Sequence, residues 1–252
     1  MRTAAAMVCL MVVAAMPSGA QSSGATAAAR RLAAAREAIG GGGRLQAITS
    51  LVIRGQARHR NQHYKKRPGA TREWIDRTLE VRASWPDHFL MIGTLDLAGR
   101  RVEHREGFAG QSSLAAKFQA ASYYQIEFAR RMLLLLLRTD TVFPLTAVST
   151  AGRSGALEFT GAHEFHAHLE IDPQTRFPTR LRSRHRRFDG QGRLATGMMP
   201  WSVVTVERRV AVGGLTVPDR LRYSDDEGQT LAIETYSSLQ FNSPLTSADF
   251  RR

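Results

Sequence analysis

Residues 74–85 read Trp-Ile-Asp-Arg-Thr-Leu-Glu-Val-Arg-Ala-Ser-Trp, and this stretch decides the fold class. Its apolar side chains recur at every second position, at Ile75, Leu79, Val81 and Ala83, with mostly charged and hydroxyl-bearing residues between them. A period of two places the two sets of side chains on opposite faces of a β-strand. The stretch therefore predicts a strand with one face toward a core.

The same alternation continues on both sides of this stretch. It begins at Ile48, with Leu51 and Ile53 in phase, and it resumes at Phe89 after the turn sequence Pro86-Asp87. Turn sequences such as Gly213-Gly214 separate the later segments, which favours an antiparallel meander. Further strands are expected at Val142–Val148, Ala156–Thr160, Glu164–Ile171, Phe177–Arg186, Val203–Val212, Leu215–Tyr223 and Leu231–Phe241.

Two segments have the spacing of helices instead. Ala27–Ile39 is rich in alanine and is followed by the glycine run Gly40–Gly43, which can supply left-handed backbone at a helix end. Ser113–Arg138 has no glycine or proline, and its apolar residues recur at three and four. Its last part, Met132–Leu137, is apolar on every side and should be buried all round. The expected fold class is mainly β (α+β), with an N-terminal helix and one long central helix.

The first 20 residues have the pattern of a cleavable signal peptide. Arg2 precedes the apolar stretch Ala4–Met16, and the small residues Ser18-Gly19-Ala20 form a cleavage site before Gln21. The alternative is an uncleaved anchor, but the apolar run is shorter than the roughly 20 residues that span a bilayer. We expect a periplasmic or secreted protein with a single domain over residues 21–252. Cys9 is the only cysteine, so the mature chain would form no disulfide.

The chain is strongly basic, with a formal net charge of +13 over 252 residues. Arginine carries almost all of this charge and clusters in two tracts, Arg58–Arg72 and Arg176–Arg193. In a strand, Arg180, Arg182 and Arg184 would lie on one face, where guanidinium groups could bind the phosphates of anionic lipid head groups. The alternative is that these arginines form an ordinary solvated face. Nucleic acid is not an expected partner of an exported protein.

Catalytic motifs are scarce in the sequence. There is no G-x-S-x-G nucleophile motif, and Cys9 would leave with the signal peptide, so no catalytic residue is assigned. The best metal-site candidate is the segment His163–His168, in which Glu164, His166 and His168 would share one strand face. A metal-dependent hydrolase is therefore one alternative; the other interpretation is that this polar face simply meets water. No cofactor is indicated.

Several segments together resemble a known family. The helix, glycine run and Leu-x-x-Ile link into the first strand cover Ala38–Leu51, and Gly214–Pro218 and Phe241–Phe250 fit near the end. In this order of elements the chain resembles the lipoprotein-carrier-like superfamily of LolA and LolB type. The resemblance implies a strongly curved antiparallel sheet, an incomplete barrel, with helices across its concave face.

This resemblance also implies a ligand site between the long helix and the sheet. It suggests an apolar cavity with these lining residues: Trp85, Phe89, Met91, Phe118, Phe128, Leu133 and Leu136. The alternative is that they are ordinary core residues. The leading hypothesis is a monomeric, non-enzymatic carrier of lipid acyl chains or lipoprotein that works with a membrane-protein partner. The remaining alternative is an envelope module that binds partners through its basic faces.

Overall fold

The computed structural model of the chain describes residues 19–61, 73–97, 100–114, 121–151, 156–189 and 193–251. Residues 1–18 of the predicted signal peptide, Phe118 and residues 62–72 of the first basic tract lie outside this range. Most described residues lie in strands, which confirms the mainly β class. The elements are α1 (Gly19–Ile39), α2 (Gly42–Gln46), β1 (Ser50–Arg60), β2 (Trp74–Ser84), β3 (His88–Leu97), β4 (Arg100–Ala109), β5 (Ser112–Ser113), α3 (Ala121–Leu136), β6 (Thr146–Ala151), β7 (Ala156–Gly161), β8 (Phe165–Ile171), β9 (Pro178–Arg184), β10 (Arg186–Phe188), β11 (Leu194–Met198), β12 (Ser202–Val212), β13 (Leu215–Ser224), β14 (Thr230–Phe241) and η1 (Ser247–Phe250).

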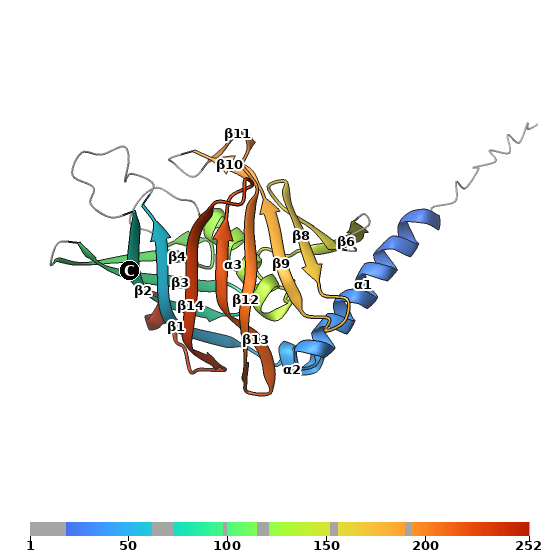
Figure 1. Cartoon of the computed structure of the whole chain (residues 1–252), viewed down its shortest axis with the longest axis horizontal. Helices are drawn as coiled ribbons and strands as arrows, with labels where there is room; N and C mark the ends of the chain where they lie inside the picture. The colour runs from blue at the N-terminus through green and yellow to red at the C-terminus, as the bar shows by residue number, and fades with distance from the viewer. Residues whose placement is uncertain are drawn as a thin grey trace, which may run out of the picture.

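One large antiparallel sheet dominates the molecule (Figure 1). Its 12 strands follow the order β5-β4-β3-β2-β1-β14-β13-β12-β9-β8-β7-β6. The first and last long strands, β1 and β14, pair in its middle, with Leu51 opposite Phe241 and Ile53 opposite Leu239. Strands β5 and β6 are the two edges and do not pair with each other, so the sheet is an incomplete barrel.

The helices cover the inner side of this curved sheet. Helix α3 contacts β3, β4 and β5 from one half of the sheet and β9 and β13 from the other, and α1 lies against β6, β7 and β13. The inward set of strand residues, such as Leu79, Val81 and Ala83 of β2, is buried in the same core as α3. The alternation seen in residues 74–85 therefore sets which face of the sheet meets the helix.

Two glycines are required by close backbone approaches. Gly40 ends α1 with a φ of 140°, and a Cβ there would lie 2.4 Å from Leu215 Cδ2. Gly55 sits at an irregularity in the β1–β14 pairing, where a Cβ would lie 2.2 Å from the Thr235 carbonyl oxygen. The expected left-handed backbone after the first helix is thus confirmed.

The bounds of both predicted helices differ from the structure. In the described residues helix α1 spans Gly19–Ile39 and so includes residues before the predicted start at Ala27, and the predicted cleavage point after Ala20 falls within it. Helix α3 spans Ala121–Leu136 in the described residues, and Ser113 and Leu114, which were expected in it, are not helical. Ser112–Ser113 instead pairs with β4 as strand β5, and the Leu114 amide donates to the Gly107 carbonyl at 2.8 Å. Pairing with a neighbouring strand overrides the helical spacing of these residues.

Besides β5, strands β4 and β11 have no counterpart among the segments expected from alternation. The first half of strand β4 carries Arg100, Arg101, Glu103, His104 and Arg105. It is therefore polar on both faces and lacks the alternation of apolar and polar residues that predicts a strand. Strand β11 pairs with β10 in a separate two-stranded ribbon between β9 and β12. The first half of β4 and strand β11 are therefore paired with a neighbour without an alternating apolar face, whereas Phe108 near the end of β4 is buried in the core.

Candidate ligand-binding concavity

The middle of α3 packs on an aromatic floor formed by Trp85, Phe89 and Phe108. Phe128 of α3 lies with its ring centroid 5.2 Å from Phe89, 5.8 Å from Phe108 and 5.8 Å from Trp85. Along the same helix, Met132 to Leu136 are all at most 2% exposed. Of the predicted lining residues, the structure thus brings Trp85, Phe89 and Phe128 together under the helix.

The other predicted lining residues lie around this floor. Leu133 and Leu136 are buried on α3, and Met91 of β3 is half-buried, with its sulfur 3.8 Å from an Arg131 guanidinium nitrogen. Phe118 lies outside the described residues. Burial of these side chains is what either a ligand site covered by a helix or an ordinary core would give.

The sequence analysis did not identify a buried polar cluster at the middle of α3. Arg131 donates to both carboxylate oxygens of Glu234, at 2.7 and 3.1 Å, and to the Tyr236 hydroxyl at 2.6 Å. The hydroxyls of Tyr223 and Tyr236 also donate to Glu234, at 3.0 and 2.6 Å. We call Arg131, Tyr223, Glu234 and Tyr236 the central polar cluster. It joins α3 to β13 and β14.

Electrostatics keep the central polar cluster ionised. Burial opposes the charged form of Glu234, but the Arg131 charge and the hydrogen bonds from Arg131 and both tyrosines outweigh it and lower the pKa of Glu234 to about 2. Burial opposes the charged form of Arg131 as well, but the charge of Glu234, the two tyrosines and the hydrogen bond to Glu234 together outweigh it and raise the pKa of Arg131 well above its ordinary value. A bidentate guanidinium–carboxylate pair is the arrangement that best offsets the cost of burying two charges.

Two further basic groups lie near this cluster on β1 and β2. His59 has its pKa lowered to about 4, first by burial and then by the charge of Arg77. Burial also lowers the pKa of Arg77. In the described part of the chain, His59 Nε2 and Arg77 Nε are buried without a hydrogen-bond partner. The inner face is therefore polar beside β1 and β2 and apolar toward the C-terminal end of α3.

Little free space remains between α3 and the sheet on the side of β9, β12 and β13. The cavity found there has a volume of about 10 Å³, which is no more than one water molecule occupies. It lies among Glu127, Arg130, Arg131, Leu134, Leu181, Val204, Leu221 and Tyr223. Side chains of α3 and of these strands therefore fill the space between them.

A larger hollow of about 410 Å³ lies elsewhere, at the far ends of β1 to β4. Gln56, Thr78 and Thr94 are paired neighbours on three adjacent strands and have the phase of the outward-facing residues. None of the predicted lining residues borders this hollow, and all of its lining residues except Leu95 are polar or charged. The hollow is lined by Gln56, Asp76, Arg77, Thr78, Thr94, Leu95 and Arg101.

The C-terminal end of α3 is tied to the N-terminal helices. Arg36 of α1 donates twice to the Leu137 carbonyl, at 3.0 and 2.8 Å. Arg138 donates to the carbonyls of Leu45 and Ile48 at 3.1 and 2.7 Å. Hydrogen bonds from charged donors to helix-end carbonyls are strong. This end of the helix is therefore fixed to α1, to α2 and to the link that follows α2.

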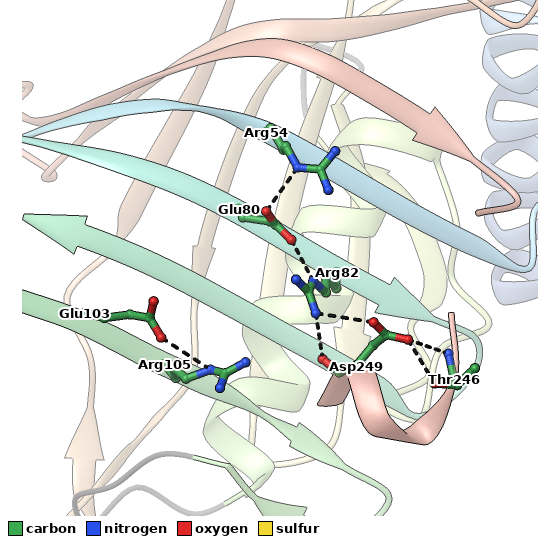
Figure 2. A network of polar contacts seen from close by, with 7 residues as sticks. All are labelled: Arg54, Glu80, Arg82, Glu103, Arg105, Thr246 and Asp249. Carbon is green, nitrogen blue, oxygen red and sulfur yellow. Dashed lines mark hydrogen bonds and ion pairs between the residues drawn. The ribbon is translucent and has the colours of Figure 1, made fainter. Parts of the chain in front are cut away.

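The outer face of the sheet carries arginines in ion-paired rows. Figure 2 shows one row on β1 and β2, in which Glu80 accepts from Arg54 at 3.0 Å and from Arg82 at 2.6 Å. Arg82 also donates to Asp249 of η1 at 3.4 Å, and Asp249 in turn caps that helix by accepting from the Thr246 amide (Figure 2). This row fastens the C-terminal segment to the outer face.

The predicted head-group arginines lie on the outer face of β9. Leu181 and Ser183 between them are buried, so Arg180, Arg182 and Arg184 share the opposite face. Arg182 and Arg184 lie on the ring of Trp201, 4.5 and 4.6 Å from its centroid, and Arg182 also pairs with Asp226 at 2.7 Å. Arg180 pairs with Glu170 at 3.6 Å.

The predicted metal-ligand set is not assembled. His163 and Glu164 have φ values of 55° and 52° and form a turn, so β8 begins one residue later than expected, at Phe165. Glu164 pairs with Arg186 at 3.5 Å, and His168 lies 3.7 Å from Glu158. Across the described ranges, no three His, Cys, Asp or Glu side chains come close enough to hold a metal ion.

No helix in the described part of the chain combines the length and the apolar character needed to cross a membrane.

Comparisons with known proteins give the fold but no close relative. No protein-family model and no curated protein sequence matches the chain. Among solved structures, a LolA superfamily protein from Nitrosomonas europaea superposes with a TM-score of 0.51 at 11% identity, over 89% of this chain and 97% of the other.

Two further solved structures are more distant. A DUF1329 family protein from Desulfovibrio piger gives a TM-score of 0.46 at 10% identity, over 92% of this chain and 97% of the other. A putative outer membrane lipoprotein-sorting protein domain from Vibrio parahaemolyticus gives 0.45 at 9% identity, over 91% of this chain and 97% of the other. The open antiparallel sheet, the helix on its inner face and the Nitrosomonas superposition lead to one conclusion: this chain has a LolA-like fold.

Proposed function

We propose that the protein is a periplasmic carrier that binds an apolar ligand, such as lipid acyl chains or a lipoprotein, between α3 and the sheet. The observation that carries the proposal is that α3 lies across the inner face of an unclosed LolA-like sheet with an apolar, fully buried C-terminal half. Apolar surface on all sides of Met132–Leu136 suits a helix that contacts the sheet and a ligand in turn. The signal-like residues 1–20 support export.

Binding would require α3 to move, because its own side chains fill the site. The C-terminal end is held by Arg36 and Arg138, whereas the N-terminal half has fewer ties, among them the bond from Gln125 to the Gly110 carbonyl at 3.1 Å. We infer that the first turns of the helix, up to Phe128, swing outward while the central polar cluster and the C-terminal end stay in place. Acyl chains would then replace the contacts of Phe128 with the aromatic floor, so the apolar burial lost by opening is regained from the ligand.

The outer arginines have a separate place in this proposal. Arg180, Arg182 and Arg184 would contact anionic head groups or a membrane-protein partner of the monomeric carrier, and their stacking on Trp201 holds two of them in a fixed geometry. No catalytic step and no cofactor are part of the proposal.

The first test is native mass spectrometry with lipid extraction on protein purified without detergent. We expect a reproducible lipid adduct that persists in Leu136→Met and is lost in Leu136→Asp. Because Asp at a buried site can unfold the chain, circular dichroism of both variants is compared with that of the parent. Lipid addition should also slow hydrogen exchange in α3 of the unaltered protein. A clean ligand-free mass together with unchanged exchange would refute the carrier.

The tight packing at α3 favours a second candidate function. With the inner face filled, the protein could serve as an envelope module that binds an anionic partner through its outer arginines. That module predicts binding to an acidic polymer that disappears at high salt, with no bound lipid. Substituting Arg180 and Arg184 with Glu should abolish this binding, whereas the carrier's lipid adduct should survive the same change.

A further inference from the structure

The two-stranded ribbon β10–β11 is an insertion between two neighbouring strands of the main sheet. It pairs Arg186 with Met198 and Phe188 with Leu194, and it projects beyond the sheet above β9 and β12 (Figure 1). Its position leaves β11 without a further strand neighbour in the described part of the chain. The ribbon therefore offers surface that the rest of the fold does not cover.

Exposed apolar side chains concentrate on this ribbon. In the described residues, three large apolar side chains count as exposed: Leu194 at 46%, Met199 at 37% and Val148 at 38%. Leu194 opens β11 and Met199 directly follows it, whereas Val148 stands alone on the edge strand β6. Leu194 lies at the loop end of β11 and Met199 at its base, so exposed apolar side chains bracket this strand at both ends.

The same ribbon is positively charged. Arg186, Arg187 and Arg193 lie on it with a single described acid, Asp189. Arg193 is paired with Asp189 at 3.0 Å yet is 73% exposed, and Arg187 is exposed with no ion pair described. Exposed leucine and methionine beside arginine is the composition that suits the interface of an anionic bilayer, where the guanidinium groups meet phosphates and the apolar tips enter the head-group region.

Phe188, at the end of β10 that leads into the hairpin turn, packs near the start of α3. Its ring lies 6.5 Å from Tyr123 in the first turn of α3 and 5.6 Å from His163 in the β7–β8 turn. A partner surface that contacts the ribbon would therefore lie next to the N-terminal end of α3.

We propose that ribbon β10–β11 is a docking site for the surface of an anionic phospholipid bilayer, entered by Leu194 and Met199 and attracted by Arg187 and Arg193. The inference goes beyond the carrier function, since it requires no particular cargo. It also names a surface distinct from the arginines on β9.

A site-specific fluorophore tests this proposal in the full chain. In a Cys9→Ser background, Leu194→Cys is labelled with an environment-sensitive dye, and Val148→Cys, which has similar exposure, is the matched control. With phosphatidylglycerol vesicles we expect a blue shift of the dye at position 194 and none at position 148. The local readout makes the result independent of any membrane binding by residues 1–20.

Three results would overturn the proposal: no shift at position 194, an equal shift at both positions, or the same shift with phosphatidylcholine vesicles. Arg187→Glu combined with Arg193→Glu should weaken vesicle binding at position 194 roughly tenfold or more, since each arginine near an anionic surface contributes several-fold. Unchanged vesicle binding by this double variant would show that Arg187 and Arg193 do not attract the bilayer. The lipid adduct of the carrier is measured separately, so failure of docking and failure of cargo binding give different results.

Discussion

Arg131 is the residue whose position is least expected from its neighbours. It precedes the six apolar residues Met132–Leu137, yet its side chain is paired with Glu234, which is 103 residues away in the chain. Local patterns can flag a charge inside an apolar helix, but they cannot say which strand supplies its partner. The predicted lining residues came from local spacing and the family resemblance, whereas the central polar cluster depends on strand register.

Replacing Arg131 with Met should lower the free energy of unfolding by about 3–5 kcal/mol, because Glu234 is left buried without its cation. Urea denaturation would measure the loss. Arg58→Met serves as control, since Arg58 and Asp76 are 59% and 79% exposed and such pairs contribute about 0–1 kcal/mol. Adding Glu234→Leu to Arg131→Met should restore part of the stability. Equal effects of Arg131→Met and Arg58→Met would show that the cluster does not stabilise the fold.

His59 should make stability depend on pH in a defined window. Its folded pKa of about 4 lies below its ordinary value of 6.5, so the unfolded chain binds the proton first. The contribution is complete above about pH 6.5 and is lost as the pH falls toward 4. After allowance for partial solvent access, we expect about 1–2 kcal/mol across this window. His59→Leu should flatten the stability curve there, and His166→Leu controls for loss of an exposed histidine. Parallel curves for His59→Leu and the parent would contradict this assignment.

At the scale of elements, α3 combines an anchored end with a first turn that is partly accessible. Ser122 and Tyr123 are partly accessible, whereas every residue from Arg131 to Leu136 is buried. The sequence predicted the buried leucine end correctly because composition alone requires it. It placed the helix start wrongly because Ser112–Ser113 is fixed by β4, a strand whose polar residues gave no signal.

We expect hydrogen exchange in α3 to be fastest in the first two turns and slowest over Leu133–Leu136. Local opening takes least free energy where burial and anchoring are weakest. Exchange measured by mass spectrometry on short peptides would resolve the two halves of the helix. Arg36→Met should speed exchange at the C-terminal end by removing two hydrogen bonds to Leu137. Uniform protection along the helix would argue against a swinging N-terminal half.

The β1–β14 pairing should tolerate no side chain at Gly55. A Cβ there would lie 2.2 Å from the Thr235 carbonyl oxygen, so Gly55→Ala must push two central strands apart. We expect a loss of about 1–3 kcal/mol in thermal or urea unfolding, the usual cost of overpacking. Gly43→Ala is the matched control, because nothing lies within 4 Å of its Cβ position and alanine favours helix α2. If the two alanine variants are equally stable, the close approach is not a real constraint.

At the scale of the whole molecule, the surface ion pairs and the apolar helix lie on opposite faces of the curved sheet. Arginine ion pairs cover the outer face, as the row from Arg54 to Asp249 shows (Figure 2), while the apolar helix lies within the curve. The sequence predicted the antiparallel meander from its turns, and the family resemblance supplied the curved sheet. Which strands meet in the middle was not predictable, because alternation gives the faces of a strand and not its neighbours.

The meeting of β1 and β14 has a consequence for how the chain acquires its structure. Thr49 and Asn242, which close this pairing at one end, are 193 residues apart. Contacts that distant carry a large loop-closure cost and slow the rate-limiting step of folding. Strands β1 to β5 can form hairpins among themselves early, but β1 keeps a bare edge until residues 230–241 arrive. During synthesis the half-built sheet would therefore be most prone to self-association just before its last strand is added.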